Sequence, residues 1–413
     1  MRKNSHFSGQ PLYGQVLKLL DKSKILDFSR QNGGEKYTKR FNCWIHLIVM
    51  LYAVIMRFDS LREITASLLA ETRKLAHLGI TFKIGRSTLA DANKRRPEAI
   101  FEAIYRDLYA TYRNVLSSDS RSRKTPKWMK RLQIIDSTTI TLFSNLLFKG
   151  VGRHPKTGKK KGGIKVHTVI HANEGVPSDI KFTSAATNDS FMLKPATLNK
   201  DDIIAMDRAY IDYAKFQELT ERGVIYVTKM KKNLKYSILS DTMYQNPDGL
   251  MEVRIQLVEF VRKQKNGDII RHKSRIITYI DPRKRKLVSL LTNDMEADPS
   301  EIIAIYRQRW EIELLFKQMK QNFPLKYFYG ESANAIKIQI WVTLIANLLL
   351  MVNLSPRWLG RQQLACGYVG CHSISALPCD CHSVAWSGLG YCQRSIWLQC
   401  RSYRHRPWCH FLQ

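Results

Sequence analysis

The chain has 413 residues and a formal net charge of +31 at pH 7, which favours a polyanionic partner, nucleic acid above all. The N-terminus lacks the apolar segment of a signal peptide, and the longest apolar runs, residues 45–56 and 340–352, are too short to span a bilayer, which argues against a membrane protein. Cys43 is the one cysteine before residue 355, which suits a reducing cytoplasm without a disulfide framework.

Residues 1–125 are predicted to form a helical domain, because apolar residues recur at helical spacing through most of this region. Residues 59–97 resemble a helix, a turn and a second helix, with Gly85 in the turn. The second helix carries Asn93 and Arg95, for which we predict contact with DNA. The alternative is a basic helix that faces solvent.

Residues 126–232 change in character to short strands rich in β-branched residues, with one helix among them. The first strand is followed by a loop rich in glycine and lysine. Lys159, Lys160 and Lys161 in this loop are predicted to contact the phosphates of any DNA sequence.

Residues 233–293 are β in character throughout, and the pair Asn266-Gly267 predicts a hairpin. Residues 294–354 return to helices. The order of four strands, a helix, a strand, a β-rich stretch and a helix predicts a mixed α/β sheet with an inserted hairpin subdomain.

Two aspartates stand in apolar strands: Asp136 lies in IIDST and Asp207 ends IIAMD. Carboxylates rarely lie in such runs unless they are paired or bind a metal. If the two strands are neighbours, the aspartates share one region of the sheet, and Glu313 can join them from a packed helix. Mg²⁺, which prefers oxygen ligands, would relieve the repulsion among three carboxylates. The alternative is that each aspartate is a turn or capping residue.

Residues 306–320, YRQRWEIELLFKQMK, are predicted to form one helix. At about 100° per residue, four of its polar side chains lie within about 60° of one another, namely Tyr306, Arg309, Glu313 and Lys320. This face borders an apolar stripe predicted to face the core, made of Ile305, Ile312, Phe316, Met319 and Phe323. The polar face could bind a metal ion and a phosphate together. The alternative is an i,i+4 ion pair between Arg309 and Glu313.

One pattern in this helix resembles the signature of insertion sequence 4 family DDE transposases: Tyr306-x2-Arg309-x3-Glu313-x6-Lys320. Asp136 in IIDST and Asp207 in MDRAY resemble the two catalytic aspartates of that family. The resemblance implies an α/β fold in which a ribonuclease-H-like catalytic core carries a β-rich insertion and follows a helical N-terminal domain.

The resemblance also implies roles for individual residues. Asp136, Asp207 and Glu313 would be catalytic and would hold two Mg²⁺ or Mn²⁺ ions. The side chains implied to contact DNA phosphates are Tyr306, Arg309, Lys320, Lys165, Arg208 and Tyr210. The family usually has glycine where this chain has Ala209, which suggests a turn with positive φ at that position.

The implied reaction is cut-and-paste transposition, in which a metal-bound water nicks DNA at the element end. The freed 3′ hydroxyl then forms a hairpin, which is reopened before strand transfer. The partners would be the terminal inverted repeats, target DNA and a second copy of the chain, in a bacterial cytoplasm at the nucleoid. The alternatives are a metal-dependent nuclease without strand transfer and a transposase-derived DNA-binding protein that has lost its chemistry.

Residues 355–413 differ in composition from everything before them. They contain no lysine or glutamate, seven of the eight cysteines and four of the eight tryptophans. We predict that this atypical tail is an out-of-frame translation. Before it, residues 126–232 and 294–354 are predicted to form the two parts of the core. The alternative is a zinc module, which the close spacing of Cys379 and Cys381 disfavours.

Overall fold

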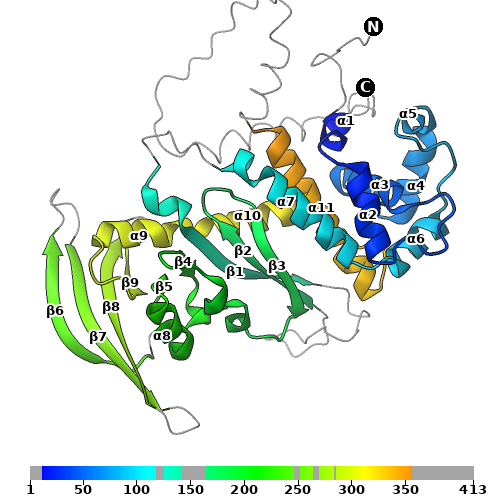
Figure 1. The fold of residues 1–413 in the computed structure, drawn as a ribbon. Helices are drawn as coiled ribbons and strands as arrows, with labels where there is room; N and C mark the ends of the chain where they lie inside the picture. Colours follow the sequence, from blue (N-terminus) through cyan, green and yellow to red (C-terminus); the bar gives the residue numbers. More distant parts are fainter. Residues whose placement is uncertain are drawn as a thin grey trace, which may run out of the picture.

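The computed structural model describes residues 12–117, 125–141, 163–231, 233–245, 252–263, 269–282 and 285–355. The predicted loop lysines, Lys159, Lys160 and Lys161, and the tail after residue 355 lie outside these ranges. The described chain forms a helical N-terminal region, a nine-stranded mixed sheet and a set of C-terminal helices. Figure 1 shows the helical region at one end of an elongated molecule and the last strands of the sheet at the other.

The N-terminal region is helical, as predicted. Its helices are α1 (Leu12–Leu17), α2 (Lys22–Gln31), α3 (Cys43–Met56), α4 (Leu61–Ala70), α5 (Thr72–Ala76), α6 (Arg86–Arg95) and α7 (Ala99–Leu116). Side-chain oxygens of Asp21, Asn42 and Ser60 accept backbone N–H groups in the first turns of α2, α3 and α4, which is why these helices begin where they do. Helix α6 begins directly after Gly85, as the helix–turn–helix prediction requires, and packs against α4.

One sheet contains all the described strands, in the order β3-β2-β1-β4-β5-β9-β8-β7-β6. The strands are β1 (Leu132–Thr141), β2 (Gly163–His171), β3 (Pro177–Ser184), β4 (Ile203–Met206), β5 (Ile225–Lys229), β6 (Ser237–Gln245), β7 (Glu252–Lys263), β8 (Ile269–Asp281) and β9 (Lys286–Thr292). Strand β4 runs parallel to both β1 and β5, and the other neighbours are antiparallel. The predicted mixed α/β sheet is confirmed.

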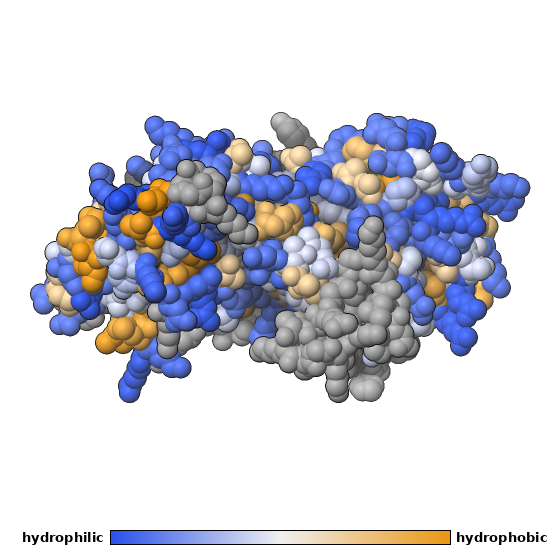
Figure 2. Space-filling model, turned by 90° about the horizontal axis from the view of Figure 1, so that it is seen from below, coloured by the Kyte–Doolittle hydropathy of each residue, from blue (hydrophilic) through white to orange (hydrophobic). Residues whose placement is uncertain are grey.

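The β-rich stretch continues this sheet through the antiparallel pairing of β9 with β5. Figure 2 shows hydrophobic surface gathered at the end of the molecule formed by these strands. The exposed apolar side chains there are Ile238, Leu239, Met243, Val261, Ile269, Ile280 and Leu287. Among the described strands β6 lies at the outer edge of the sheet, so this end presents both apolar side chains and an unpaired strand edge.

The remaining helices are α8 (Tyr213–Glu221), α9 (Pro299–Gln308), α10 (Trp310–Asn322) and α11 (Ala333–Asn353). The helix predicted over residues 306–320 is divided at Arg309, whose N–H bonds to the Tyr306 carbonyl three residues back instead of four. Its predicted core stripe is confirmed, because Ile305, Ile312, Phe316, Met319 and Phe323 are all buried.

Helix α11 packs against α3 and α7, so that side chains from both ends of the described chain share one hydrophobic core. The apolar run at residues 340–352 is part of this longer helix of 21 residues, which is long and apolar enough to cross a membrane. The helix is longer than the run, so the length of the run alone does not decide whether the helix could cross a membrane. However, 83% of its most apolar stretch is buried inside the protein, as in a core helix.

Candidate active site

Two aspartates lie at the same level on neighbouring parallel strands. The register of β1 and β4 sets Ile135 opposite Met206. Asp136 is the next residue of β1 and Asp207 directly follows β4, so the parallel pairing brings both to one region of the sheet. This is the adjacency on which the sequence-based prediction of an acidic site depended.

Arg309 joins this region of the sheet to Glu313 on α10. Its Nη1 lies 3.6 Å from Oδ2 of Asp136, and its Nη2 lies 2.5 Å from Oε1 of Glu313. The Arg309 side chain is only 14% exposed, and among the described residues its Nε has no hydrogen-bond partner. A single cation therefore bridges two of the three predicted catalytic carboxylates, and the i,i+4 ion pair weighed from sequence forms as well.

The electrostatics of Asp136 reflect this crowding. Burial raises the pKa of Asp136 to about 6, and the nearby charges of Asp207 and Glu313 also raise it. The Ser137 N–H, which donates to Asp136 Oδ1 at 2.8 Å, and the Arg309 guanidinium hold that pKa down. Asp136 thus interacts with both of the other carboxylates in one partly buried site.

The other two members of the predicted polar face are Tyr306, which lies beside Arg309, and Lys320, which reaches β1. The ring of Tyr306 is 5.7 Å from the Arg309 guanidinium, and Lys320 Nζ donates to the Thr139 carbonyl at 3.0 Å. Burial raises the pKa of Tyr306 and lowers that of Lys320. The structure therefore brings Arg309 and Lys320 against β1, with Glu313 and Tyr306 as neighbours of Arg309.

A fourth carboxylate, Asp189, lies beside these groups and was not found from the sequence. Its Oδ1 accepts from Ser137 Oγ at 2.6 Å and lies 3.2 Å from Lys165 Nζ. Lys165 also donates to the Thr187 carbonyl at 2.7 Å, so this predicted phosphate ligand is held by protein groups. Asp189 stands in the polar stretch Asn188-Asp189-Ser190, which resembles an ordinary turn, and only its contacts with distant residues distinguish it.

Tyr210 points into the protein and not toward solvent. It is 1% exposed, and its hydroxyl has no hydrogen-bond partner in the described chain. Burial raises its pKa, and the charges of Asp136, Asp189 and Asp207 raise it further, so the hydroxyl stays protonated among three carboxylates. The burial of Tyr210 leaves no exposed face for the phosphate contact predicted for it.

The neighbours of Tyr210 are exposed, and their backbone is ordinary. Arg208 and Ala209 both face solvent. Ala209 lies in the 3₁₀ turn η4 (Arg208–Tyr210) and is not among the described residues with positive φ. The suggestion of a left-handed turn at this position is therefore wrong, and alanine fits here without backbone strain.

The two residues predicted to contact DNA from α6 differ sharply. Asn93 is fully buried: its Oδ1 accepts from His46 Nε2 at 2.8 Å, and its Nδ2 donates to the Tyr329 carbonyl at 3.4 Å. Arg95 is exposed and paired with Asp91 at 2.8 Å. Asn93 has no exposed surface for the DNA contact predicted for it, because it joins α6 to α3 and to the segment before α11.

The donor chemistry of the site suits a divalent cation, since three carboxylates interact within it. Among the described residues, however, no three His, Cys, Asp or Glu side chains are close enough together to hold a metal ion. Arg309 supplies a physical reason, because its guanidinium takes the carboxylate oxygens of Asp136 and Glu313. The carboxylates are suitable ligands for a divalent cation, but here two of them are paired with Arg309 and the set is not arranged around a metal position.

Carboxylates gathered at one place on a mixed sheet are chemically suited to bind divalent metals in phosphodiester chemistry. Residues 127–349 match the family described as Transposase DDE domain, more than half of the 413-residue chain, and the chain belongs to that family. Residues 8–81 match a domain of unknown function (DUF4372).

Relatives carry the same assignment. The sequence named as transposase y4zB of Sinorhizobium fredii is 28% identical over 65% of this chain and 71% of its own length. The one named as transposase of insertion sequence element IS4SA, from Synechocystis, is 26% identical over 67% and 74%. A solved piggyBac transposase synaptic complex with hairpin DNA aligns at 11% identity and a TM-score of 0.39, over 88% of this chain and 83% of that one. The resemblance to insertion sequence 4 transposases is confirmed by the family and these relatives.

Proposed function

We propose that this DNA transposase performs metal-dependent cut-and-paste transposition, with Asp136, Asp207 and Glu313 as its catalytic carboxylates. One observation carries the proposal: the register of β1 with β4 aligns the two aspartates, and Arg309 links Asp136 to Glu313.

We further propose that strands β1–β5 and their helices form a ribonuclease-H-like core, into which β6–β9 are inserted before the glutamate. The strand order β3-β2-β1-β4-β5, with β1–β3 antiparallel and β4 and β5 parallel to β1, supports this assignment. Helix α10 packs against β1, which is where a glutamate must stand to meet both aspartates.

Asp136, Asp207 and Glu313 would hold two Mg²⁺ or Mn²⁺ ions, which when bound activate water and stabilise the leaving oxygen of an in-line displacement. The chain's own residues then bind and orient the DNA. Arg309 would exchange its carboxylate partners for a phosphate, and Tyr306 at the end of α9 and Lys320 on α10 would be further phosphate ligands. Asp189 would be a positioning residue that fixes Ser137, the neighbour of Asp136, together with Lys165.

In the first step, water attacks a phosphodiester at the element end, and the strand leaves as a 3′ hydroxyl. That hydroxyl attacks a phosphodiester of the opposite strand and displaces its 3′ oxygen, which gives a hairpin. Water would then open the hairpin and regenerate the 3′ hydroxyl, which would attack a target phosphodiester and displace the 3′ oxygen of the target strand. The substrates are the terminal inverted repeats and target DNA, and a pair of ends calls for two copies of the chain. A DNA substrate would put the enzyme at the nucleoid of a bacterial cytoplasm.

The test uses the full chain with a pair of inverted-repeat DNA ends and Mg²⁺. Asp136→Asn, Asp207→Asn and Glu313→Gln should each abolish cleavage while DNA binding is kept. Glu311→Gln is the matched control, because Glu311 is exposed on the same helix. Cleavage at the wild-type rate in any of the three variants would overturn its assignment. Cutting without joined products would favour the nuclease, and binding alone would favour the inactive scaffold.

A further inference from the structure

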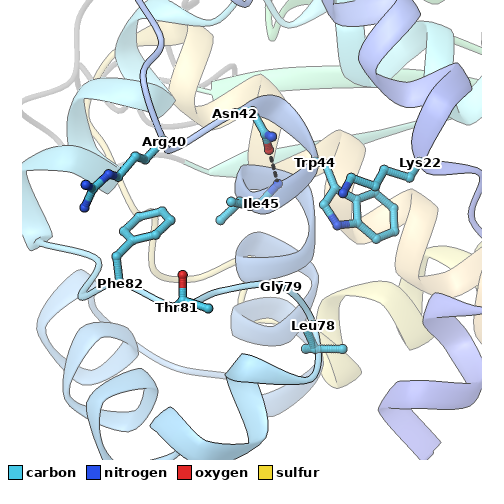
Figure 3. A pocket seen from close by; sticks show the side chains of 9 residues that line it. All are labelled: Lys22, Arg40, Asn42, Trp44, Ile45, Leu78, Gly79, Thr81 and Phe82. Atoms are coloured by element: carbon cyan, nitrogen blue, oxygen red, sulfur yellow. Dashed lines mark hydrogen bonds between the residues drawn. The ribbon is translucent and has the colours of Figure 1, made fainter.

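A cavity of about 500 Å³ lies in the helical region, away from the catalytic carboxylates. It is formed where the starts of α2 and α3 meet the segment at residues 78–82, which links α5 to α6 (Figure 3). Its volume is in the range of small-ligand sites. Most of its wall falls within residues 8–81, the part of the chain that matches a domain of unknown function.

The cavity is positively charged. Lys22 and Arg40 line it, and no carboxylate does. In the described chain neither cation forms an ion pair. The neighbouring carboxylate of Asp21 is engaged in capping α2, where it accepts from the Ser23 and Lys24 N–H groups. Two cations without acidic partners favour an anionic ligand.

The cavity also has two aromatic walls. In Figure 3, Arg40 and Phe82 lie on one side, and Lys22 and Trp44 lie on the other. Trp44 and Phe82 are half-buried and pack against the hydrophobic core, so each ring is held in place before a ligand binds. Fixed aromatic rings beside cations are the combination that binds unstacked nucleotides: the base stacks on a ring, and the phosphate meets the cation.

We propose that this cavity receives an unstacked nucleotide of DNA, with its base against Trp44 or Phe82 and its phosphate at the cation on the same side, Lys22 beside Trp44 or Arg40 beside Phe82. The inference rests on the proposed DNA substrate, but not on the chemistry of the carboxylates. An acidic peptide would satisfy the cations and leave both rings without a role. Because a base must leave the duplex stack to enter, DNA with an unpaired nucleotide should bind better than fully paired DNA.

The test measures binding of the full chain, without divalent ions, to a duplex that contains one unpaired 2-aminopurine and to the same duplex fully paired. Trp44→Leu should weaken binding to the first duplex about tenfold and leave the second unchanged, because stacking on one base is lost. Arg40→Gln should weaken both and lower the salt slope by about one. Arg30→Gln is the matched control, because Arg30 is an exposed cation at the other end of α2, paired with Asp27.

Several results would overturn the proposal. One is that the Trp44→Leu protein and the Phe82→Leu protein both bind the two duplexes with wild-type affinity. Another is that these variants lose the same amount of affinity for the unpaired and the fully paired duplex. If Trp44→Leu melts early, Trp44→Phe keeps a ring and must keep the preference for the unpaired duplex. Polyglutamate competing as well as single-stranded DNA would assign the cavity to acidic peptides instead. Cleavage by Mg²⁺-loaded enzyme, measured separately, reports on the carboxylates alone.

Discussion

Arg309 holds Asp136 across the site, with Nη1 3.6 Å from Oδ2, while the same guanidinium pairs with Glu313. The arginine thus competes for the oxygens that a divalent ion needs. Tyr306, Glu313 and Asp136 raise the pKa of Arg309 against the opposing effect of its burial, so it stays charged at any pH of interest. Metal loading should therefore depend on where this side chain lies.

Arg309→Gln should bind Mn²⁺ about tenfold more tightly than the wild type in the absence of DNA, because the competing charge-assisted hydrogen bonds are gone. Its cleavage of DNA should nevertheless fall, because the phosphate contact is lost. Titration calorimetry measures the first effect and a gel assay the second. Unchanged Mn²⁺ affinity would show that the guanidinium does not compete with the ion.

The raised pKa of Asp136 has a consequence for stability. The value is about 6 in the folded protein against an ordinary 3.8, so the folded state binds this proton more tightly than the unfolded chain. The stabilisation from the protonated form is complete below about pH 4 and is lost as pH rises through 6. Relative to Asp136→Asn, the free energy of unfolding of the wild type should fall by about 2–3 kcal/mol between pH 4 and 7.

Urea unfolding of both proteins at several pH values checks this, because groups remote from Asp136 titrate alike in each protein. Parallel curves for the two proteins would contradict the assigned pKa. If the wild type loses stability relative to Asp136→Asn as pH approaches neutrality, the charged Asp136 destabilises the fold. Such a cost is common for functional carboxylates.

Asp189 should act through its contacts with Ser137 and Lys165. Asp189→Ala should lower cleavage about 10–100-fold, the usual effect of removing a partner that orients a metal ligand. Asp189→Asn keeps an acceptor for Ser137 and should recover part of that loss, with little change in DNA affinity. Asp179→Asn, at a partly exposed aspartate on β3, is the control. Equal loss in the Ala and Asn variants would exclude orientation through Ser137.

The parts of the fold that follow from local pattern were predictable. The apolar stripe of α10 repeats at helical spacing, and Asp136 and Asp207 stand out because their strands are otherwise apolar. The polar face of the helix follows from its turn angle alone. In each case the deciding residues lie within one element, so no knowledge of distant neighbours was needed.

The parts that depend on distant contacts were not predictable. Asp189 meets Ser137 across 52 residues, and Asn93 meets Tyr329 across 236, so neither partner could be inferred from spacing. The break of the helix at Arg309 and the pairing of β9 with β5 likewise depend on packing. A basic amphipathic helix indicates an exposed face, but Asn93 lies on the opposite side, where a polar side chain can be buried because it is fully hydrogen-bonded.

Asn93 and Arg95 separate a structural role from a DNA-binding role on one helix. Asn93→Ala should lower the free energy of unfolding by about 1–3 kcal/mol, because it leaves His46 and the Tyr329 carbonyl unsatisfied in the core.

Arg95→Gln should leave stability within about 0.5 kcal/mol, since its pair with Asp91 is exposed. It should instead weaken binding to element ends, more for cognate than for scrambled DNA if Arg95 contacts bases. Urea unfolding and binding isotherms on both DNAs measure the two effects. An Asn93→Ala protein of wild-type stability with altered end preference would restore the DNA contact that the buried position argues against.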